Sequence, residues 1–189
     1  VWMARREAQP LGRFVHWGFA PTDVMVGLVA GFGLHWGVEG LYRLLEGLGV
    51  RGDASASARE LVDASPGWTG GLVLVAMVVV GAPLVEELYY RGVAQRTAME
   101  LGRGGNEAGE GRPWGSALGL AGVAAFFAVS HVTGSADFVQ VPGLVLVGLV
   151  LGLLAWRSGR LGPSIVAHGV FNLCSLMVLW GVSTPILAA

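Results

Sequence analysis

The chain has 189 residues and a formal net charge of −1, with 53% apolar and only 13% charged residues. Ordinary soluble domains contain about 25% charged residues, so this composition excludes a soluble domain and indicates an integral membrane protein. The near-neutral charge excludes nucleic acid as an expected partner. The length fits a single domain, residues 1–189, and the one cysteine cannot form a disulfide within the chain.

Apolar runs of about 20 residues are long enough to cross a membrane as helices. The sequence predicts an all-α, polytopic transmembrane helix bundle of about five spans, with room for further helices. These spans are residues 18–38, 68–88, 114–132, 138–156 and 163–186. Interfacial tryptophans gather at span ends, as six do here: Trp17, Trp36, Trp68, Trp114, Trp156 and Trp180. Glycines four residues apart predict close helix packing at three pairs: Gly27/Gly31, Gly115/Gly119 and Gly148/Gly152.

Arginines are concentrated before the first span and in alternate connections between the spans. They are Arg5, Arg6 and Arg13, then Arg91, Arg96, Arg103 and Arg112, and finally Arg157 and Arg160. Because basic residues are retained on the cytoplasmic side, this pattern predicts a cytoplasmic N-terminus. The chain begins with Val1 rather than methionine, so we expect either an alternative start codon or an earlier segment of the natural chain.

Two adjacent acids, Glu86 and Glu87, follow the uncharged run of residues 64–85. A charge in hydrocarbon costs about 2.5–3.5 kcal/mol or more, so such residues are few and usually functional. Glu87 and Arg91 are four residues apart with the acid first, which favours a helical ion pair. Glu86 points about 100° away on a helix and is free to face the interior of the bundle.

Three more polar residues lie in apolar runs. His131 ends the third run, while His168 and Asn172 share one helix face in the fifth. With Glu86 they supply a base, two switchable donors or acceptors and an amide donor, which predicts an active site. Two residues near the ends of the first run are predicted to lie at the membrane interface, Asp23 and His35.

Three motifs occur in order on consecutive apolar runs: EELYYR (86–91), FAVSH (127–131) and HGVFN (168–172). On these motifs the chain resembles the CPBP intramembrane protease family, also called the Abi or CAAX prenyl endopeptidase-like family. The resemblance covers a motif-bearing core of about residues 68–176. It implies an intramembrane endopeptidase that hydrolyses peptide bonds of membrane-associated or lipidated substrates, and we expect a bacterial plasma membrane protein.

The resemblance also implies a role for each motif residue. Glu86 and His131 would bind and activate a water molecule, and His168 and Asn172 would stabilise the oxyanion of the tetrahedral intermediate. The supporting residues would be Glu87, Arg91 and Phe127.

Metal dependence is a separate question. The favoured glutamate mechanism needs no cofactor. The alternative is a divalent metal such as zinc, bound by Glu86, His131 and His168 with one open position for water. An HExxH motif is absent from the sequence, and Asn172 is a poorer zinc ligand than oxyanion donor, so a metal-free mechanism is favoured.

Two other classes of function compete with a protease. A non-catalytic membrane binding or immunity protein would keep the fold, although the intact motifs argue against it. A proton-coupled transporter would also use buried Glu and His residues, but the chain shows no inverted repeat. The expected partners are a peptide or lipidated protein substrate and membrane lipids, and the sequence does not determine the oligomeric state or the cleavage site.

The predicted spans conflict with the predicted site. They place His131 at the outer end of its helix and Glu86 and His168 near the cytoplasmic side, a mismatch that exceeds ~15 Å at 1.5 Å per residue. Because the motif residues must meet, we expect tilted or displaced helices and a site in the cytoplasmic half of the bundle. A separation above about 10 Å would contradict the site in an active state.

Overall fold

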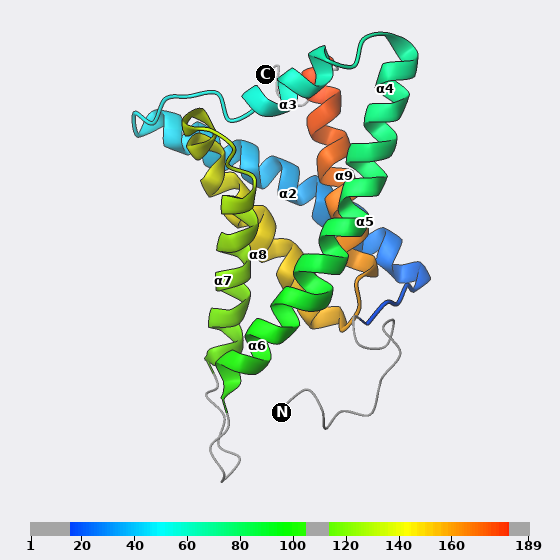
Figure 1. The fold of residues 1–189 in the computed structure, drawn as a ribbon, viewed down its shortest axis with the longest axis vertical. Helices are drawn as coiled ribbons and strands as arrows, with labels where there is room; N and C mark the ends of the chain where they lie inside the picture. The colour runs from blue at the N-terminus through cyan, green and yellow to red at the C-terminus, as the bar shows by residue number, and fades with distance from the viewer. Residues whose placement is uncertain (1–15, 105–113, 182–189) are drawn as a thin grey trace.

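A computed structural model describes residues 16–104 and 114–181, and these residues form helices with no strand among them (Figure 1). The predicted all-α fold is confirmed. Its α-helices are α2 (Pro21–Gly47), α3 (Ala56–Asp63), α4 (Gly67–Val75), α5 (Ala82–Glu86), α6 (Arg96–Arg103), α7 (Gly115–Ser130), α8 (Val141–Ser158) and α9 (Gly162–Leu179). Two π-helical segments, η2 (Ala76–Gly81) and η3 (Glu87–Gln95), join α4 to α6, and the 3₁₀ helix η4 (Ser135–Gln140) precedes α8.

Four helical runs among the described residues are long and apolar enough to cross a membrane: Pro21–Gly47, Gly67–Arg103, Phe138–Ser158 and Gly162–Leu179. These runs confirm the prediction of a polytopic membrane protein. The predicted span 114–132 corresponds to the 16-residue helix α7. At 1.5 Å per residue α7 is about 24 Å long, shorter than a hydrocarbon core of about 30 Å. Residues 182–186 of the last predicted span lie outside the described residues.

The predicted limit of the second span was wrong. The helical run does not end at residue 88. It spans 37 residues in total, from Gly67 to Arg103, and passes without a break through α4, α5 and α6 (Figure 1). The residues after Glu86 suit a helix, and three polar side chains at four-residue spacing turn inward: the charged Glu87 and Arg91 and the neutral Gln95 are all buried. A hydropathy pattern counts these charges without knowing that they face protein rather than lipid.

The length of this helical run removes the predicted mismatch in depth between Glu86 and His131. Glu86 lies near the middle of the run, not at the end where the predicted span placed it. The short helix α7 ends at Ser130, so His131 follows it immediately. A long helix bearing Glu86 at its centre and a short helix ending at His131 bring the two motifs to similar depth.

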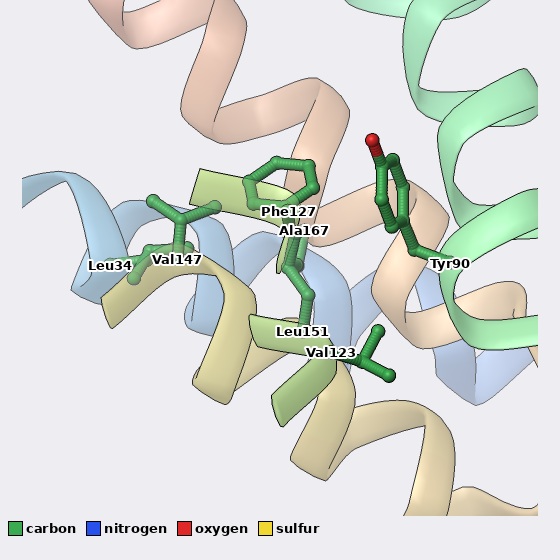
Figure 2. Close-up of a cluster of buried hydrophobic side chains, with 7 residues drawn as sticks. All are labelled: Leu34, Tyr90, Val123, Phe127, Val147, Leu151 and Ala167. Atoms are coloured by element: carbon green, nitrogen blue, oxygen red, sulfur yellow. The ribbon is translucent and has the colours of Figure 1, made fainter. Parts of the chain in front are cut away.

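The helices meet around a small apolar core (Figure 2). Buried side chains from five helical segments form it: Leu34, Tyr90, Val123, Phe127, Val147, Leu151 and Ala167. The predicted glycine pairs do lie at close helix contacts. A Cβ atom at Gly31 would come within 2.6 Å of the Val170 Cβ atom, and one at Gly148 within 2.9 Å of the Ala124 Cα atom. Small residues therefore set the spacing of α2 against α9 and of α8 against α7.

Asp23 lies in the first turn of α2, and its side chain is fully buried within the protein. Its carboxylate accepts a hydrogen bond of 2.7 Å from the Ala20 amide and pairs with Arg160 at 2.6 Å. This arrangement begins α2 and fixes it to the α8–α9 connection, and the Asp23 carboxylate raises the pKa of Arg160. The arginines Arg5, Arg6, Arg13 and Arg112, used for the orientation, lie outside the described residues.

Candidate active site

Three predicted site residues from three separate helices meet in the structure. Glu86 ends α5, His131 follows α7, and His168 lies in α9. The Glu86 Oε2 atom is 3.8 Å from the Nε2 atom of His131 and 3.8 Å from the Nε2 atom of His168. These distances are far below the separation of about 10 Å that would contradict the site.

The Glu86 Oε2 atom is buried and has no hydrogen-bond partner among the described residues. Burying a carboxylate oxygen without a donor is costly, so a group that donates hydrogen bonds is expected beside it. The two flanking Nε2 atoms bound the space in which such a group would sit. The geometry therefore brings one carboxylate oxygen and two imidazole nitrogens to one point, each within reach of a shared hydrogen-bonding group.

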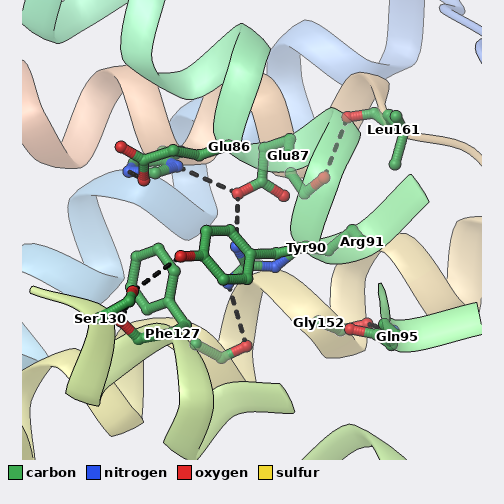
Figure 3. Close-up of polar contacts among 12 residues, drawn as sticks. Glu86, Glu87, Tyr90, Arg91, Gln95, Phe127, Ser130, Gly152 and Leu161 are labelled. Atoms are coloured by element: carbon green, nitrogen blue, oxygen red, sulfur yellow. Dashed lines mark hydrogen bonds and ion pairs between the residues drawn. The ribbon is translucent and has the colours of Figure 1, made fainter. Parts of the chain in front are cut away.

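Glu87 links Arg91 to His168 behind the site (Figure 3). It is fully buried, and its Oε1 atom lies 2.9 Å from Arg91 Nη1 and 3.0 Å from His168 Nδ1. The structure thus forms the Glu87–Arg91 pair that the spacing favours. Because the Glu87 carboxylate accepts from Nδ1, it orients the His168 ring so that Nε2 faces Glu86.

Arg91 is fixed on two further sides. Its Nη2 atom donates to the Gly148 carbonyl at 3.3 Å, and its guanidinium lies 4.7 Å from the centre of the Phe127 ring. The Phe127 side chain is buried beside both histidines, with ring-centre distances of 4.6 Å to His131 and 6.1 Å to His168. Phe127 therefore packs against the site, where the resemblance expects it.

The tautomer of His131 follows from its backbone partner. Its Nδ1 atom lies 2.8 Å from the Phe127 carbonyl oxygen, which can only accept, so Nδ1 holds the proton. In the neutral ring Nε2 then has a free lone pair directed at Glu86. The same carbonyl accepts from the Ser130 hydroxyl at 2.7 Å, and that hydroxyl bonds Tyr90 Oη at 2.7 Å (Figure 3).

The sequence prediction missed three polar residues that support the site: Tyr90, Ser130 and Gln95. Gln95 is buried, and its Nε2 atom donates to the Gly152 carbonyl at 2.9 Å (Figure 3). A signal for Gln95 existed, because it continues the four-residue spacing of Glu87 and Arg91 on one helix face. No comparable signal existed for the bond between Tyr90 and Ser130, which are 40 residues apart.

Asn172 is placed differently from the other predicted residues. It lies on α9 one turn after His168, and its Nδ2 atom donates to the Val78 carbonyl at 2.8 Å. One of its two amide N–H groups is thus engaged with the backbone of η2, and the other is left for a further acceptor.

Within residues 16–104 and 114–181, no three His, Cys, Asp or Glu side chains have an arrangement that could hold a metal ion. The alternative set of Glu86, His131 and His168 converges, but it does not meet that geometry. Zinc dependence therefore stays a prediction for chelation to test.

An apolar groove of about 290 Å³ lies beside the site, between the η2–α5 segment and α9. It is lined by Val79, Val80, Leu84, Ile165, Val166, Gly169, Val170 and Leu173. Two lining residues flank site positions along α9, since Gly169 follows His168 and Leu173 follows Asn172. The groove and the polar centre therefore share the helix α9 but are lined by different residues of it.

The comparisons with known proteins agree with this arrangement. No match was found among curated proteins or among solved structures. A family model described as Type II CAAX prenyl endopeptidase Rce1-like matches residues 68–174, which is more than half of the chain and includes all three motifs. The predicted relationship is confirmed: this integral membrane protein belongs to the Type II CAAX prenyl endopeptidase Rce1-like family, a family of CAAX-type intramembrane endopeptidases.

Proposed function

We propose that this chain is a glutamate-type intramembrane endopeptidase that cleaves membrane-associated or lipidated peptides. One observation carries the proposal: the buried Glu86 Oε2 atom has no hydrogen-bond donor among the residues that the structure describes, and it lies 3.8 Å from both imidazole Nε2 atoms. A carboxylate this close to two imidazoles can accept a proton from a water molecule that all three groups hold.

In the proposed reaction, water binds between Glu86 and His131. Glu86 takes one proton as the water oxygen bonds to the carbonyl carbon of the scissile peptide, and the carbonyl oxygen becomes an oxyanion. His168 and the free N–H of Asn172 donate to that oxyanion. The C–N bond then breaks, and Glu86 returns the proton to the leaving amine, so that atoms and charge balance.

The protonation state of His168 decides whether it can donate to the oxyanion. Its Nδ1 atom faces the Glu87 carboxylate at 3.0 Å, so Nδ1 is a donor. A His168 that also donates from Nε2 must hold both ring protons. Glu87 and Arg91 would therefore act by positioning His168 rather than by touching the substrate.

The apolar groove supports a substrate with a hydrocarbon portion. Its lining is almost entirely apolar, and it lies along α9 next to the site. A lipid chain or an apolar transmembrane segment could lie in it while the scissile bond reaches Glu86. The groove therefore supports a membrane-associated or prenylated peptide as the substrate.

We also propose that the N-terminus is cytoplasmic. Among the described residues, four arginines lie on α6, at the end of α8 or in the α8–α9 connection: Arg96, Arg103, Arg157 and Arg160. Under the positive-inside rule these segments face the cytoplasm. Single introduced cysteines in a Cys174→Ser background, labelled from each side of sealed vesicles, would test this orientation.

The decisive experiment compares wild type with Glu86→Gln in host membranes at matched expression. Glutamine keeps the shape of glutamate but removes the base. Quantitative membrane peptidomics should show specific shortened peptides only with wild type. Glu39→Gln is the matched control, because Glu39 is an exposed acid paired with Arg43 outside the site and should leave cleavage intact.

A chelator added to the same samples separates the two mechanisms. Cleavage that survives chelation supports the glutamate mechanism, and cleavage that is lost and then restored by zinc supports the metal alternative. Identical peptides from wild type and a folded Glu86→Gln variant would instead support a non-catalytic binding or immunity protein. Glu86-dependent ion flux in vesicles would support a transporter.

A further inference from the structure

Pro83 interrupts the backbone hydrogen bonds of the helix that bears Glu86. In η2 the bonds run five residues back, as shown by the Ala82 amide donating to the Met77 carbonyl. The next bond in this register would join residue 83 to the Val78 carbonyl. Proline has no N–H, so Val78 receives no such bond from its own helix.

Asn172 supplies the missing donor from a different helix. Its Nδ2 atom lies 2.8 Å from the Val78 carbonyl oxygen. A carbonyl without a donor inside a membrane is costly, because no bulk water is available to replace the lost bond. The side chain of Asn172 therefore completes the backbone of η2 where Pro83 cannot.

Gly169 makes this contact possible. A Cβ atom at this position would lie 2.7 Å from the Val79 carbonyl oxygen, so only glycine allows α9 to approach η2 this closely. Val79 is four residues before Pro83 and would be its acceptor in an α-helical register. Both carbonyls that Pro83 could have bonded thus face α9, and one of them is bonded by Asn172.

This bond joins two of the helices that form the site. Pro83 lies three residues before Glu86, and Asn172 lies four residues after His168. We propose that Asn172 is a positioning residue for Glu86, because its bond to Val78 fixes the helix bearing Glu86 against the helix bearing His168. The inference rests on the proposed function and leaves the second amide N–H free for the oxyanion.

A double-mutant cycle between Pro83 and Asn172 tests the inference on the full chain in detergent. Asn172→Ala removes the donor, and Pro83→Ala restores a backbone N–H that completes the helix without help from α9. Two quantities are measured for wild type, both single variants and the double variant. They are the melting temperature and kcat for cleavage of a peptide identified by the peptidomics experiment, assayed well below melting.

We expect Asn172→Ala to lower the melting temperature by about 3–5 °C and kcat by about tenfold or more. In the Pro83→Ala background the same substitution should lower the melting temperature by less than about 1 °C. The double variant should also recover part of the kcat that Asn172→Ala loses. Loss of an oxyanion donor would lower kcat equally in both backgrounds, so the share of kcat that returns with Pro83→Ala measures positioning.

Ser175→Ala is the matched control. The Ser175 hydroxyl bonds the Phe171 carbonyl within α9, so its loss should have the same small effect in both backgrounds. Equal losses for Asn172→Ala in both backgrounds would overturn the inference and leave Asn172 as an oxyanion donor alone. If Asn172→Ala does not fold, a folded double variant supports the inference and an unfolded one overturns it.

The cycle also distinguishes failure of the inference from failure of the proposed function. Melting temperatures require no substrate. If wild type cleaves nothing while the melting temperatures still show coupling between the two positions, the helix contact stands and the protease assignment fails. If wild type cleaves but the two positions are independent, the protease assignment stands and the positioning role fails.

Discussion

Two Glu–Arg pairs in this chain have the same local pattern and different surroundings. Glu39–Arg43 and Glu87–Arg91 are both four residues apart on a helix, with N–O distances of 3.2 Å and 2.9 Å. The side chains of the first pair are 45% and 55% exposed, whereas those of the second are 0% and 1% exposed. The four-residue spacing thus predicts that an ion pair forms. The fold decides whether that pair is exposed on the surface or buried beside the site.

The largest stability effect should come from breaking the buried pair. Glu87→Gln leaves the Arg91 charge buried without its partner, which should cost about 3–5 kcal/mol of unfolding free energy. Glu39→Gln should cost at most about 0.5 kcal/mol. Denaturant unfolding of the two variants in detergent measures both values. Similar losses would show that burial does not distinguish the pairs.

An intermediate effect is expected at the Asp23–Arg160 pair, because Asp23 is buried while 35% of the Arg160 side chain is exposed. Asp23→Asn keeps the shape but removes the charge that Arg160 faces. Its melting temperature should fall between those of Glu87→Gln and Glu39→Gln. A value equal to that of Glu39→Gln would mean that solvent at Arg160 cancels the burial of Asp23.

A smaller change tests the neutral hydrogen bonds around His131. Ser130→Ala removes the hydroxyl between Tyr90 and the Phe127 carbonyl, which should cost about 1 kcal/mol. Because the Ser130 hydroxyl also lies 3.4 Å from His131 Nδ1 and helps to hold the ring, kcat should also fall, by about tenfold. Ser175→Ala is the control and should keep the kcat of wild type. An unchanged kcat in Ser130→Ala would show that His131 holds its orientation without Ser130.

The smallest effect should be at Asp53, in the exposed connection between α2 and α3. Hydrogen bonds from the Ser55 hydroxyl and amide lower the pKa of Asp53 below its usual 3.8. A lowered folded-state pKa stabilises the fold above pH 3.8 and loses that contribution as the pH falls through the folded-state value. Asp53→Asn should lower the melting temperature at pH 7 by about 1 °C or less.

The comparison of Asp53→Asn with wild type is repeated at decreasing pH. The difference in melting temperature should close once the pH lies below the folded-state pKa of Asp53. A difference that persists there would come from something other than the charge of Asp53.

Much of the site was predictable because its residues are unusual in their local setting. Glu86, His131 and His168 stand out as ionisable groups in apolar runs, and the four-residue spacing predicts the Glu87–Arg91 pair. The roles of these residues stay predictions, since geometry brings them together without showing a reaction. Tyr90 and Ser130 were not predictable, because their bond joins two helices and neither residue type is rare.

The sequence by itself determined an all-helical membrane protein, its family and the residues that approach one another. Composition and helical periodicity are local properties, and they require no knowledge of neighbouring helices. Only the tertiary structure decided that the second helix continues to Arg103, that Asp23 is buried and that Asn172 bonds Val78. Each of these depends on which face of a helix meets protein, because a polar group is costly toward lipid and stable once another helix supplies its partner.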